Sequence, residues 1–198
     1  KVAYVPNNSD GDNNSYKNTG GENTAGASGD STTGYQLTAA PIDGLKIGAD
    51  FIDADGVTGI KNVQEQQAGG WYANYALGNF KIGYGERHYA PGIGAARISA
   101  GAHAYKLEQV GIELAVNDAL SVSYMTEEST RKSYGAAVNA AAGGSPFART
   151  SITFESQYLQ AAYDIGGATV GIANVESSNS GYTAGDASIT VVSLALAF

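Results

Sequence analysis

ASITVVSLALAF, residues 187–198, is the stretch of this chain that decides its fold. Successive side chains of a β-strand point to opposite sides of a sheet, so every second residue from Thr190 to Phe198 shares one face. Most domains leave their ends loose, whereas a strand that runs to the last residue ties the C-terminus into a sheet. A closed barrel would give such a strand a partner on both sides, but the final strand of a soluble sandwich would alternate in the same way. Both interpretations are open at this point.

The composition favours a membrane barrel over other classes of small domain. The 198 residues include 27 Gly and 13 Tyr but no Cys, which excludes a disulfide scaffold and a cysteine zinc module. Charged residues make up 15%, against roughly 25% in an average soluble domain. No run approaches the ~20 apolar residues of a membrane-spanning helix. The 11 basic residues against 19 acidic ones argue against a nucleic-acid partner.

Short turn signals recur along the chain between alternating segments. Four of them contain the Asn, Asp or Gly that supplies the positive φ of tight hairpins, and they span residues 41–44, 77–80, 116–119 and 165–168. Longer polar stretches separate the hairpins, at residues 6–33, 90–101, 128–150 and 176–186. Short turns at one end of the strands and long loops at the other are typical of outer-membrane barrels, whose short turns are periplasmic.

We predict ten strands that pair in sequence order into one antiparallel sheet. Their expected bounds are residues 1–5, 34–41, 44–53, 66–77, 80–89, 102–116, 119–127, 151–164, 168–176 and 187–198. The predicted fold class is an all-β, antiparallel transmembrane β-barrel that spans residues 1–198 as one domain, with residues 6–33 as a long extracellular loop. Residues 1–5 read as the end of a strand, so we expect the barrel to be incomplete at its N-terminus. A soluble up-and-down barrel or sandwich would alternate similarly, and a parallel β-helix would need a shorter repeat.

Each predicted hairpin has one face without charged residues, which we assign to lipid. This face contains Leu45, Ile47, Ala49, Phe51, Phe80, Ile82, Tyr84, Val110, Ile112, Leu114, Val116, Leu120, Val122 and Tyr124. A charge at the bilayer midplane costs on the order of 2–4 kcal/mol, so charged neighbours should point the other way. We therefore predict five pore-lining residues: Lys46, Asp50, Lys81, Arg87 and Glu113. Alternation alone does not decide this, since the same residues would face solvent on a half-exposed soluble sheet.

Aromatic residues lie near the ends of the predicted strands. Six of them could form the girdles that membrane barrels carry at both interfaces: Tyr35, Trp71, Tyr75, Tyr84, Tyr124 and Tyr163. The alternative is ordinary packing, because aromatic side chains are favoured on any sheet.

The segment GYQLTAAPIDGLKIGADF, residues 34–51, taken with the tail and the hairpin repeat, resembles the C-terminal part of a general Gram-negative porin of the alphaproteobacterial type. The resemblance implies a 16-stranded, trimeric, water-filled barrel in the cell outer membrane, of which this chain would supply the last ten strands. It also implies passive diffusion of small hydrophilic solutes and ions, with membrane lipid and lipopolysaccharide around the barrel. The constricting loop of that family lies earlier in the barrel, so none of its selectivity residues is carried over.

The tail by itself resembles the C-terminal signature of Gram-negative outer-membrane barrels, which end in Phe after alternating apolar residues. Phe198, Leu196, Leu194 and Val192 match that signature. The resemblance implies that these four side chains form a docking signal for the barrel-assembly machinery.

The sequence gives little support to an enzyme. Its two histidines, His88 and His103, fall near the predicted extracellular ends of strands. Omptins, which are ten-stranded outer-membrane proteases, use acidic residues and a histidine at that rim, so the strand number keeps this class open. This chain has no Asp-His dipeptide, and we expect no acidic pair at the rim opposite either histidine. We expect no catalysis, and keep as an alternative a complete ten-stranded barrel that acts as a surface protease or adhesin.

Residues 10–14, Asp-Gly-Asp-Asn-Asn, resemble the start of a calcium loop with oxygen ligands at alternate positions. The glycine at the sixth place and the glutamate at the twelfth are missing, because Ser15 and Gly21 stand there. No phosphate-binding GxxxxGK[ST] loop occurs. We expect no metal ion and no cofactor in the barrel, with calcium binding by this loop left as an open alternative.

Overall fold

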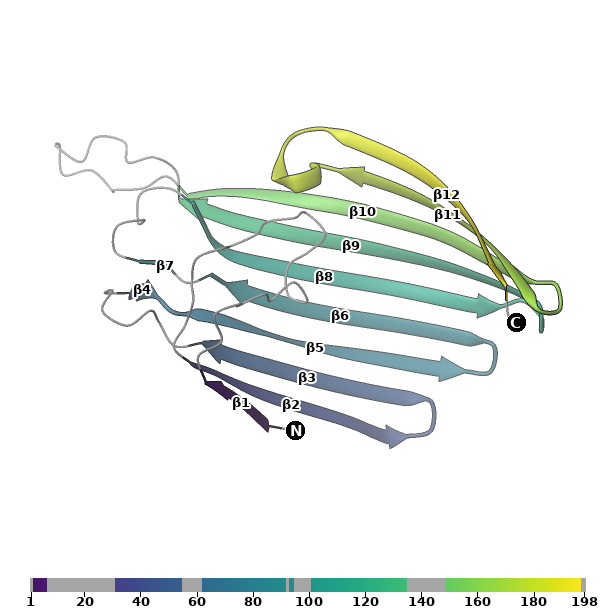
Figure 1. The fold of residues 1–198 in the computed structure, drawn as a ribbon, viewed down its shortest axis with the longest axis horizontal. Helices are drawn as coiled ribbons and strands as arrows, with labels where there is room; N and C mark the ends of the chain where they lie inside the picture. The colour runs from purple at the N-terminus through teal and green to yellow at the C-terminus, as the bar shows by residue number, and fades with distance from the viewer. Residues whose placement is uncertain are drawn as a thin grey trace.

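A computed structural model describes residues 2–6, 31–54, 62–91, 93–94, 101–134 and 149–196 of the chain. Its main feature is a curved sheet of ten antiparallel strands, each hydrogen-bonded to the next in sequence order (Figure 1). The strands are β1 (Val2–Pro6), β2 (Ser31–Ile42), β3 (Leu45–Ala54), β5 (Gln66–Leu77), β6 (Phe80–Ala90), β8 (Gly101–Ala115), β9 (Leu120–Tyr134), β10 (Arg149–Asp164), β11 (Ala168–Ser178) and β12 (Asp186–Leu196). The all-β class, the ten strands and their order are as predicted.

One predicted loop is wrong at its start. We expected residues 128–150 to form a loop, but β9 continues to Tyr134 and stays paired with β10. The polar side chains in this segment take part in the sheet: the Thr130 and Thr153 hydroxyls, for example, are hydrogen-bonded at 3.0 Å. A strand whose outward positions are polar reads as a loop in the sequence, which explains the error.

Two short strands were not predicted. They are β4 (Asn62–Gln64) and β7 (Ile93–Gly94), which pair with each other beside the main sheet. The side chain of Gln64 joins them to the main sheet, because its Nε2 donates hydrogen bonds to the carbonyls of Pro91 and His103, both at 2.8 Å.

The four short turns lie where the sequence predicts them, together at one end of the sheet (Figure 1). In the first turn Gly44 has φ 76°, and a Cβ there would overlap the carbonyl oxygen of Ala76, so this position requires glycine. In the third turn Asn117 Oδ1 accepts hydrogen bonds from the backbone N–H groups of Ala119 and Leu120, each at 2.9 Å. We call the parts of the strands next to these turns the turn half, and the parts next to the longer connections the loop half.

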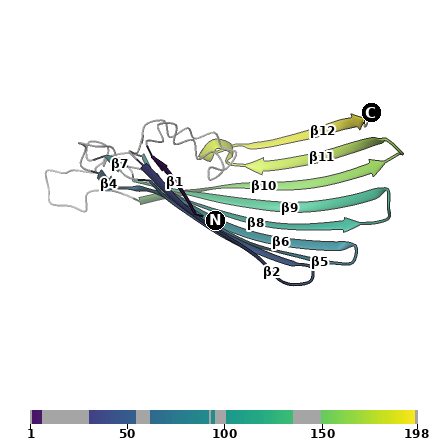
Figure 2. The same ribbon diagram turned by 60° about the horizontal axis from the view of Figure 1, so that its bottom comes forward.

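Strand register assigns every described side chain to one of two faces, because residues directly opposite each other project to the same side. Glu113, Ser123 and Gln160 lie on the face that we call concave, since residues of five strands line a hollow there. Ile82, Ile112 and Tyr124 lie on the opposite, convex face. The curvature of the sheet is visible in Figure 2.

The two halves of the sheet distribute apolar side chains in opposite ways. In the turn half the convex face is an apolar band, formed by Tyr35, Leu37, Leu45, Ile47, Phe51, Trp71, Tyr75, Leu77, Phe80, Ile82, Tyr84, Val110, Ile112, Leu114, Leu120, Val122, Tyr124, Leu159, Tyr163, Val170, Ile172, Val192, Leu194 and Leu196. In the loop half the large buried apolar side chains lie on the concave face, beside buried polar residues such as Ser129 and Ser156. There a buried cluster forms from Ala68, Tyr89, Tyr105, Phe154 and Tyr182.

The sheet has two open edges in the part of the chain that the structure describes. There β12 pairs with β11 alone, and β1 pairs with β2 alone. The strand order is therefore that of an up-and-down barrel, but the described strands do not close into one. None of the described helices is long and apolar enough to cross a membrane.

Candidate functional site

The five residues predicted to line a pore all lie on the concave face. Lys46 and Asp50 are on β3, Lys81 and Arg87 on β6, and Glu113 on β8. The pairing places Asp50, Gly70 and Arg87 in one row across three strands, and Lys81 directly opposite Glu113. The sequence pattern therefore assigned these five side chains to the same face correctly.

Four of the five form ion pairs, which the sequence did not reveal. Lys81 Nζ lies 2.8 Å from Glu113 Oε1, and Arg87 Nη2 lies 3.4 Å from Asp50 Oδ1. The second pair spans β5, and Gly70 makes room for it, because a Cβ at that position would lie 2.6 Å from Arg87 Cγ. The Lys81–Glu113 pair is exposed, so we expect it to contribute less to stability than to the electric field over the concave face.

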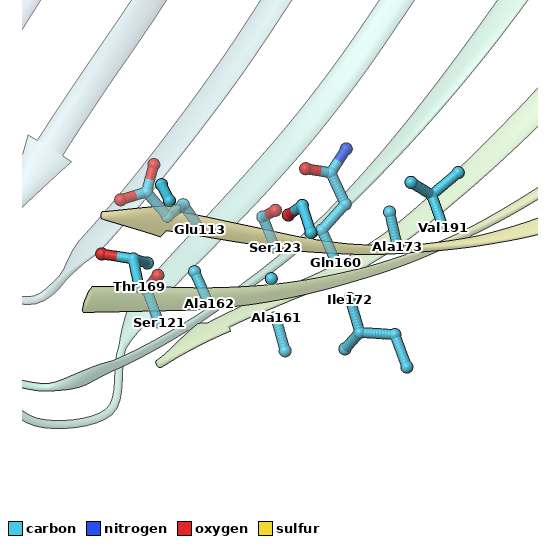
Figure 3. Close-up of a pocket in the computed structure, with 13 residues that line it drawn as sticks. Glu113, Ser121, Ser123, Gln160, Ala161, Ala162, Thr169, Ile172, Ala173 and Val191 are labelled. Carbon is cyan, nitrogen blue, oxygen red and sulfur yellow. The ribbon is translucent and has the colours of Figure 1, made fainter. Parts of the chain in front are cut away.

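Two hollows lie on the concave face of the turn half. One, of about 420 Å³, is lined by residues of five strands, among them the polar Glu113, Ser123 and Gln160 and the apolar Val191. Figure 3 shows the three polar side chains on one side of the sheet, and Ala161 and Ile172 pointing to the other side. The second hollow, of about 390 Å³, includes Asn74 and Lys81. The concave face of this half therefore offers hydrogen-bonding groups to water or to a hydrophilic solute.

Further along the concave face lies a buried carboxylate that sequence reasoning missed. Glu127 is only 5% exposed, and its Oε2 accepts a hydrogen bond of 2.8 Å from Gln109 Nε2. Its Oε1 is buried and has no hydrogen-bond partner. Ser129 and Ser156, both buried, are the neighbouring concave positions on β9 and β10. Glu127 is the last residue of the predicted strand 119–127, and the strand positions that follow it were mistaken for a loop, so the alternation around it was cut short.

The convex face of the loop half carries a row of four glutamates, which we call the acidic row. Glu86, Glu108, Glu128 and Glu155 are directly opposite one another on four consecutive strands. Lys106 Nζ lies 3.4 Å from Glu86 Oε2 and 3.1 Å from Glu108 Oε1. Folding the sequence about Asp118 would have brought Glu108 opposite Glu128, because each is ten residues from it.

The acidic row corrects one expectation about the histidines. We expected no acidic pair opposite either histidine, but Glu86 and Glu108 lie beside His88, whose Nε2 is 2.6 Å from Glu86 Oε1. This cluster is on the convex face, away from the two hollows, and the Glu86 carboxylate is already shared with Lys106. His103 lies on β8 and is not part of the cluster.

Three of the four residues of the predicted assembly signal lie on the convex face of the last strand. Val192, Leu194 and Leu196 pair with Ile172, Val170 and Ala168 on β11. Phe198 is outside the described residues.

No group of three or more His, Cys, Asp or Glu side chains in the described ranges is arranged to hold a metal ion. The calcium-like segment 10–14 and most of the predicted extracellular loop 6–33 lie outside those ranges. Comparison with protein-family models, with curated proteins and with solved structures finds no match for this chain. A function must therefore be argued from the geometry of the two faces.

Proposed function

We propose that this chain forms part of the wall of an outer-membrane porin, a water-filled barrel through which small hydrophilic solutes and ions diffuse passively. The observation that carries the proposal is the apolar band on the convex face, opposite charged and polar rows on the concave face. Its side chains include Leu37, Leu159 and Leu194, which are exposed by more than half of their surface. Soluble monomers rarely expose apolar patches larger than a few hundred Å², whereas lipid favours such a surface.

Aromatic side chains at both edges of the band also support a bilayer as its surroundings. On β5 the band extends from Trp71 to Leu77, about 20 Å along the strand. Strands of outer-membrane barrels are tilted by roughly 35–45°, so this length gives a band about 15 Å tall, shorter than the roughly 25 Å of such barrels. Trp71 and Tyr84, whose ring centroids are 5.1 Å apart, lie at its edge toward the loop half, and Tyr75 and Tyr163 lie toward the turns. Amphipathic rings at both edges suit the two interfaces of a membrane.

In the proposed pore, further strands join β12 to β1. A free strand edge exposes unpaired N–H and C=O groups, which lipid cannot satisfy. The convex side chains of β12 would face lipid, so its free edge would need another strand beside it. We propose that the ten strands are the last part of a 16-stranded, trimeric barrel, surrounded by lipid and lipopolysaccharide and inserted by the barrel-assembly machinery. The number 16, the trimer and these partners come from the resemblance of the sequence to porins.

Single-channel recording in a planar lipid bilayer tests this function. We expect stepwise current increases after addition of the purified protein, with a conductance roughly proportional to salt concentration, as for a wide aqueous pore. A heat-denatured sample is the control for contaminating channels. A folded protein that inserts into vesicles without conducting would contradict the porin and favour the alternative barrel whose work is done at the cell surface.

A further inference from the structure

The connection between β11 and β12 folds back onto the concave face of the loop half. It contains a short 3-10 turn, η3 (Ser180–Tyr182), visible in Figure 1 beside β10. Tyr182 is only 3% exposed, and its ring centroid is 5.6 Å from that of Tyr105 on β8. Its hydroxyl lies 2.7 Å from Ser129 Oγ on β9, and both atoms belong to buried residues. We call residues 179–185 the strap.

Polar contacts hold the strap at Asn179 and at Tyr182 itself. Asn179 Nδ2 donates a hydrogen bond of 2.8 Å to the carbonyl of Thr153 on β10. The guanidinium carbon of Arg131 lies 4.8 Å from the Tyr182 ring centroid, and Arg131 Nη2 donates a hydrogen bond of 3.4 Å to the Tyr182 carbonyl. The strap is therefore held by one inserted aromatic ring and a few contacts around it.

The backbone of the strap is strained where these contacts are made. Asn179 has φ 52° and Tyr182 has φ 59°, and among the described residues they alone have positive φ without being glycine. Asparagine tolerates this left-handed conformation, but a bulky residue such as tyrosine is disfavoured there. Such strain persists only where surrounding contacts impose it, and it is commonest at functional sites. Release of the Tyr182 ring would remove both the contacts and the strain.

A buried carboxylate oxygen without a hydrogen-bond partner lies one concave position from the residue that the strap covers. Glu127 is the next concave position on β9 after Ser129, the residue that Tyr182 contacts. Its Oε1 is buried without a hydrogen-bond partner, which is unfavourable for a carboxylate. Hydration of this oxygen would favour an open strap, as relief of the Tyr182 backbone would, while the aromatic and polar contacts favour the closed one. A segment with two conformations of similar free energy needs such opposing contributions, some that favour the closed strap and some that favour the open one.

We propose that the strap is a lid over the loop end of the concave face, that the structure holds it closed, and that opening exposes Glu127 to the channel. The effect of the lid on ion permeation rests on the proposed pore, but the movement of the strap does not. An open strap widens the path and adds a negative charge to its wall, so the open state passes more current and prefers cations. The partner of Glu127 in that state is a hydrated cation from the solution.

Thiol labelling measures the movement without any current. The 198-residue chain contains no cysteine, so a single Ser129→Cys substitution reports access to the atom under the Tyr182 hydroxyl. We expect a water-soluble, charged thiol reagent to modify this cysteine at least tenfold faster when Asn179→Gly is added, because this variant loses the hydrogen bond to the Thr153 carbonyl. It keeps the Tyr182 ring over position 129, so faster labelling requires the strap to move. Glycine suits φ 52°, so the substitution introduces no backbone strain. Tyr182→Phe, which keeps the ring and loses the hydroxyl contact, should give an intermediate rate.

Unchanged labelling in the Asn179→Gly variant, with a β-sheet circular dichroism spectrum equal to that of the parent, would overturn the lid. The consequence is measured separately as conductance and reversal potential in bilayers. We expect Tyr182→Gly to raise both the conductance and the cation preference, and added Glu127→Gln to remove the gain in preference while the gain in conductance remains. Faster labelling with no current in any variant would leave the lid in place and refute the pore. Current that is the same in all variants would refute the role of the lid in permeation.

Discussion

The turn half and the loop half of the same strands are built for opposite surroundings. In the turn half of β6, Ile82 faces outward from the convex side and Lys81 lies on the concave side. Seven residues further along, Tyr89 is buried on the concave side, and Glu86 and His88 occupy convex positions. The strand keeps its register throughout this stretch, so the change lies entirely in which alternate position is apolar. One continuous sheet can therefore present an exposed apolar face at one end and a buried apolar cluster at the other.

The two halves must then derive their stability from different sources. The loop half buries Tyr89, Tyr105, Phe154 and Tyr182 against each other, and this burial stabilises the fold in any aqueous surroundings. Among the described residues, the turn half buries no comparable cluster, and its large side chains remain exposed. Its stability should depend on whether lipid or detergent covers the apolar band. Substitutions placed in matched positions of the two halves separate these contributions.

The largest expected effect is the loss of a core ring from the loop half. Phe154 is 5% exposed on the concave side of β10, and Leu159, on the convex side of the same strand, is 55% exposed. Phe154→Ala should lower the free energy of unfolding by about 3–5 kcal/mol, because it leaves a cavity. Leu159→Ala should lower it by about 1–2 kcal/mol, because lipid contact is lost but no cavity is left in the protein. Urea unfolding of the vesicle-inserted protein measures both, and equal losses would contradict the difference between the halves.

The second effect concerns charge on the convex face. Ile112→Arg places a charge within the apolar band, and we expect it to cost about 2–4 kcal/mol of folding free energy in a bilayer. Glu128→Arg, on the convex side of the loop half, should be neutral or slightly stabilising because Glu108 and Glu155 lie directly opposite. Folding titrations in lipid vesicles compare the two variants. A neutral Ile112→Arg would show that the band does not lie in lipid. Ile112 is 37% exposed in the absence of lipid, so an arginine there could reach water.

Close packing on the concave face should give a smaller effect. A Cβ at Gly48 would overlap the ring of Tyr72, which lies directly across from it on β5. We therefore expect Gly48→Val to cost about 1–3 kcal/mol through displacement of that ring. Gly111→Ala is the control, because its new Cβ would lie 3.8 Å from Met125 Cγ, an ordinary contact. Thermal unfolding in detergent measures both variants, and destabilisation of the same size at Gly111 would point to a general intolerance of side chains rather than to the Tyr72 ring.

The sequence predicts the turn half well because short-range rules act there. Alternation over a few residues and the Asp43, Asn117 and Gly166 turns determine strands, register and face. The loop half depends on contacts between residues far apart in the chain, and a local pattern carries little trace of them. Tyr182 contacts Ser129 from the far side of two strands, and this pair could not be predicted without the register. The residues around Glu128 were predicted as a loop because we expected an apolar convex face along every strand. In the loop half the convex positions are polar, and the large apolar side chains are on the concave face.

The smallest expected effect tests whether the concave face lines a path for ions. Lys81→Gln removes a positive charge beside Glu113 on the concave face, and Lys106→Gln removes one beside Glu86 and Glu108 on the convex face. Both substitutions leave carboxylates without their cation, so they match in charge and differ in the side of the sheet. If the proposed pore is correct, Lys81→Gln should shift the reversal potential toward cation preference under a salt gradient, and Lys106→Gln should leave it unchanged.

The shift should be largest at low salt, since screening shortens to about 10 Å at 0.1 M. It should stay modest because Lys81 lies near the turns, where a wide barrel leaves room between the charge and the passing ion. A shift caused by Lys106→Gln alone would place the ion path on the convex side and reverse the assignment of the two faces.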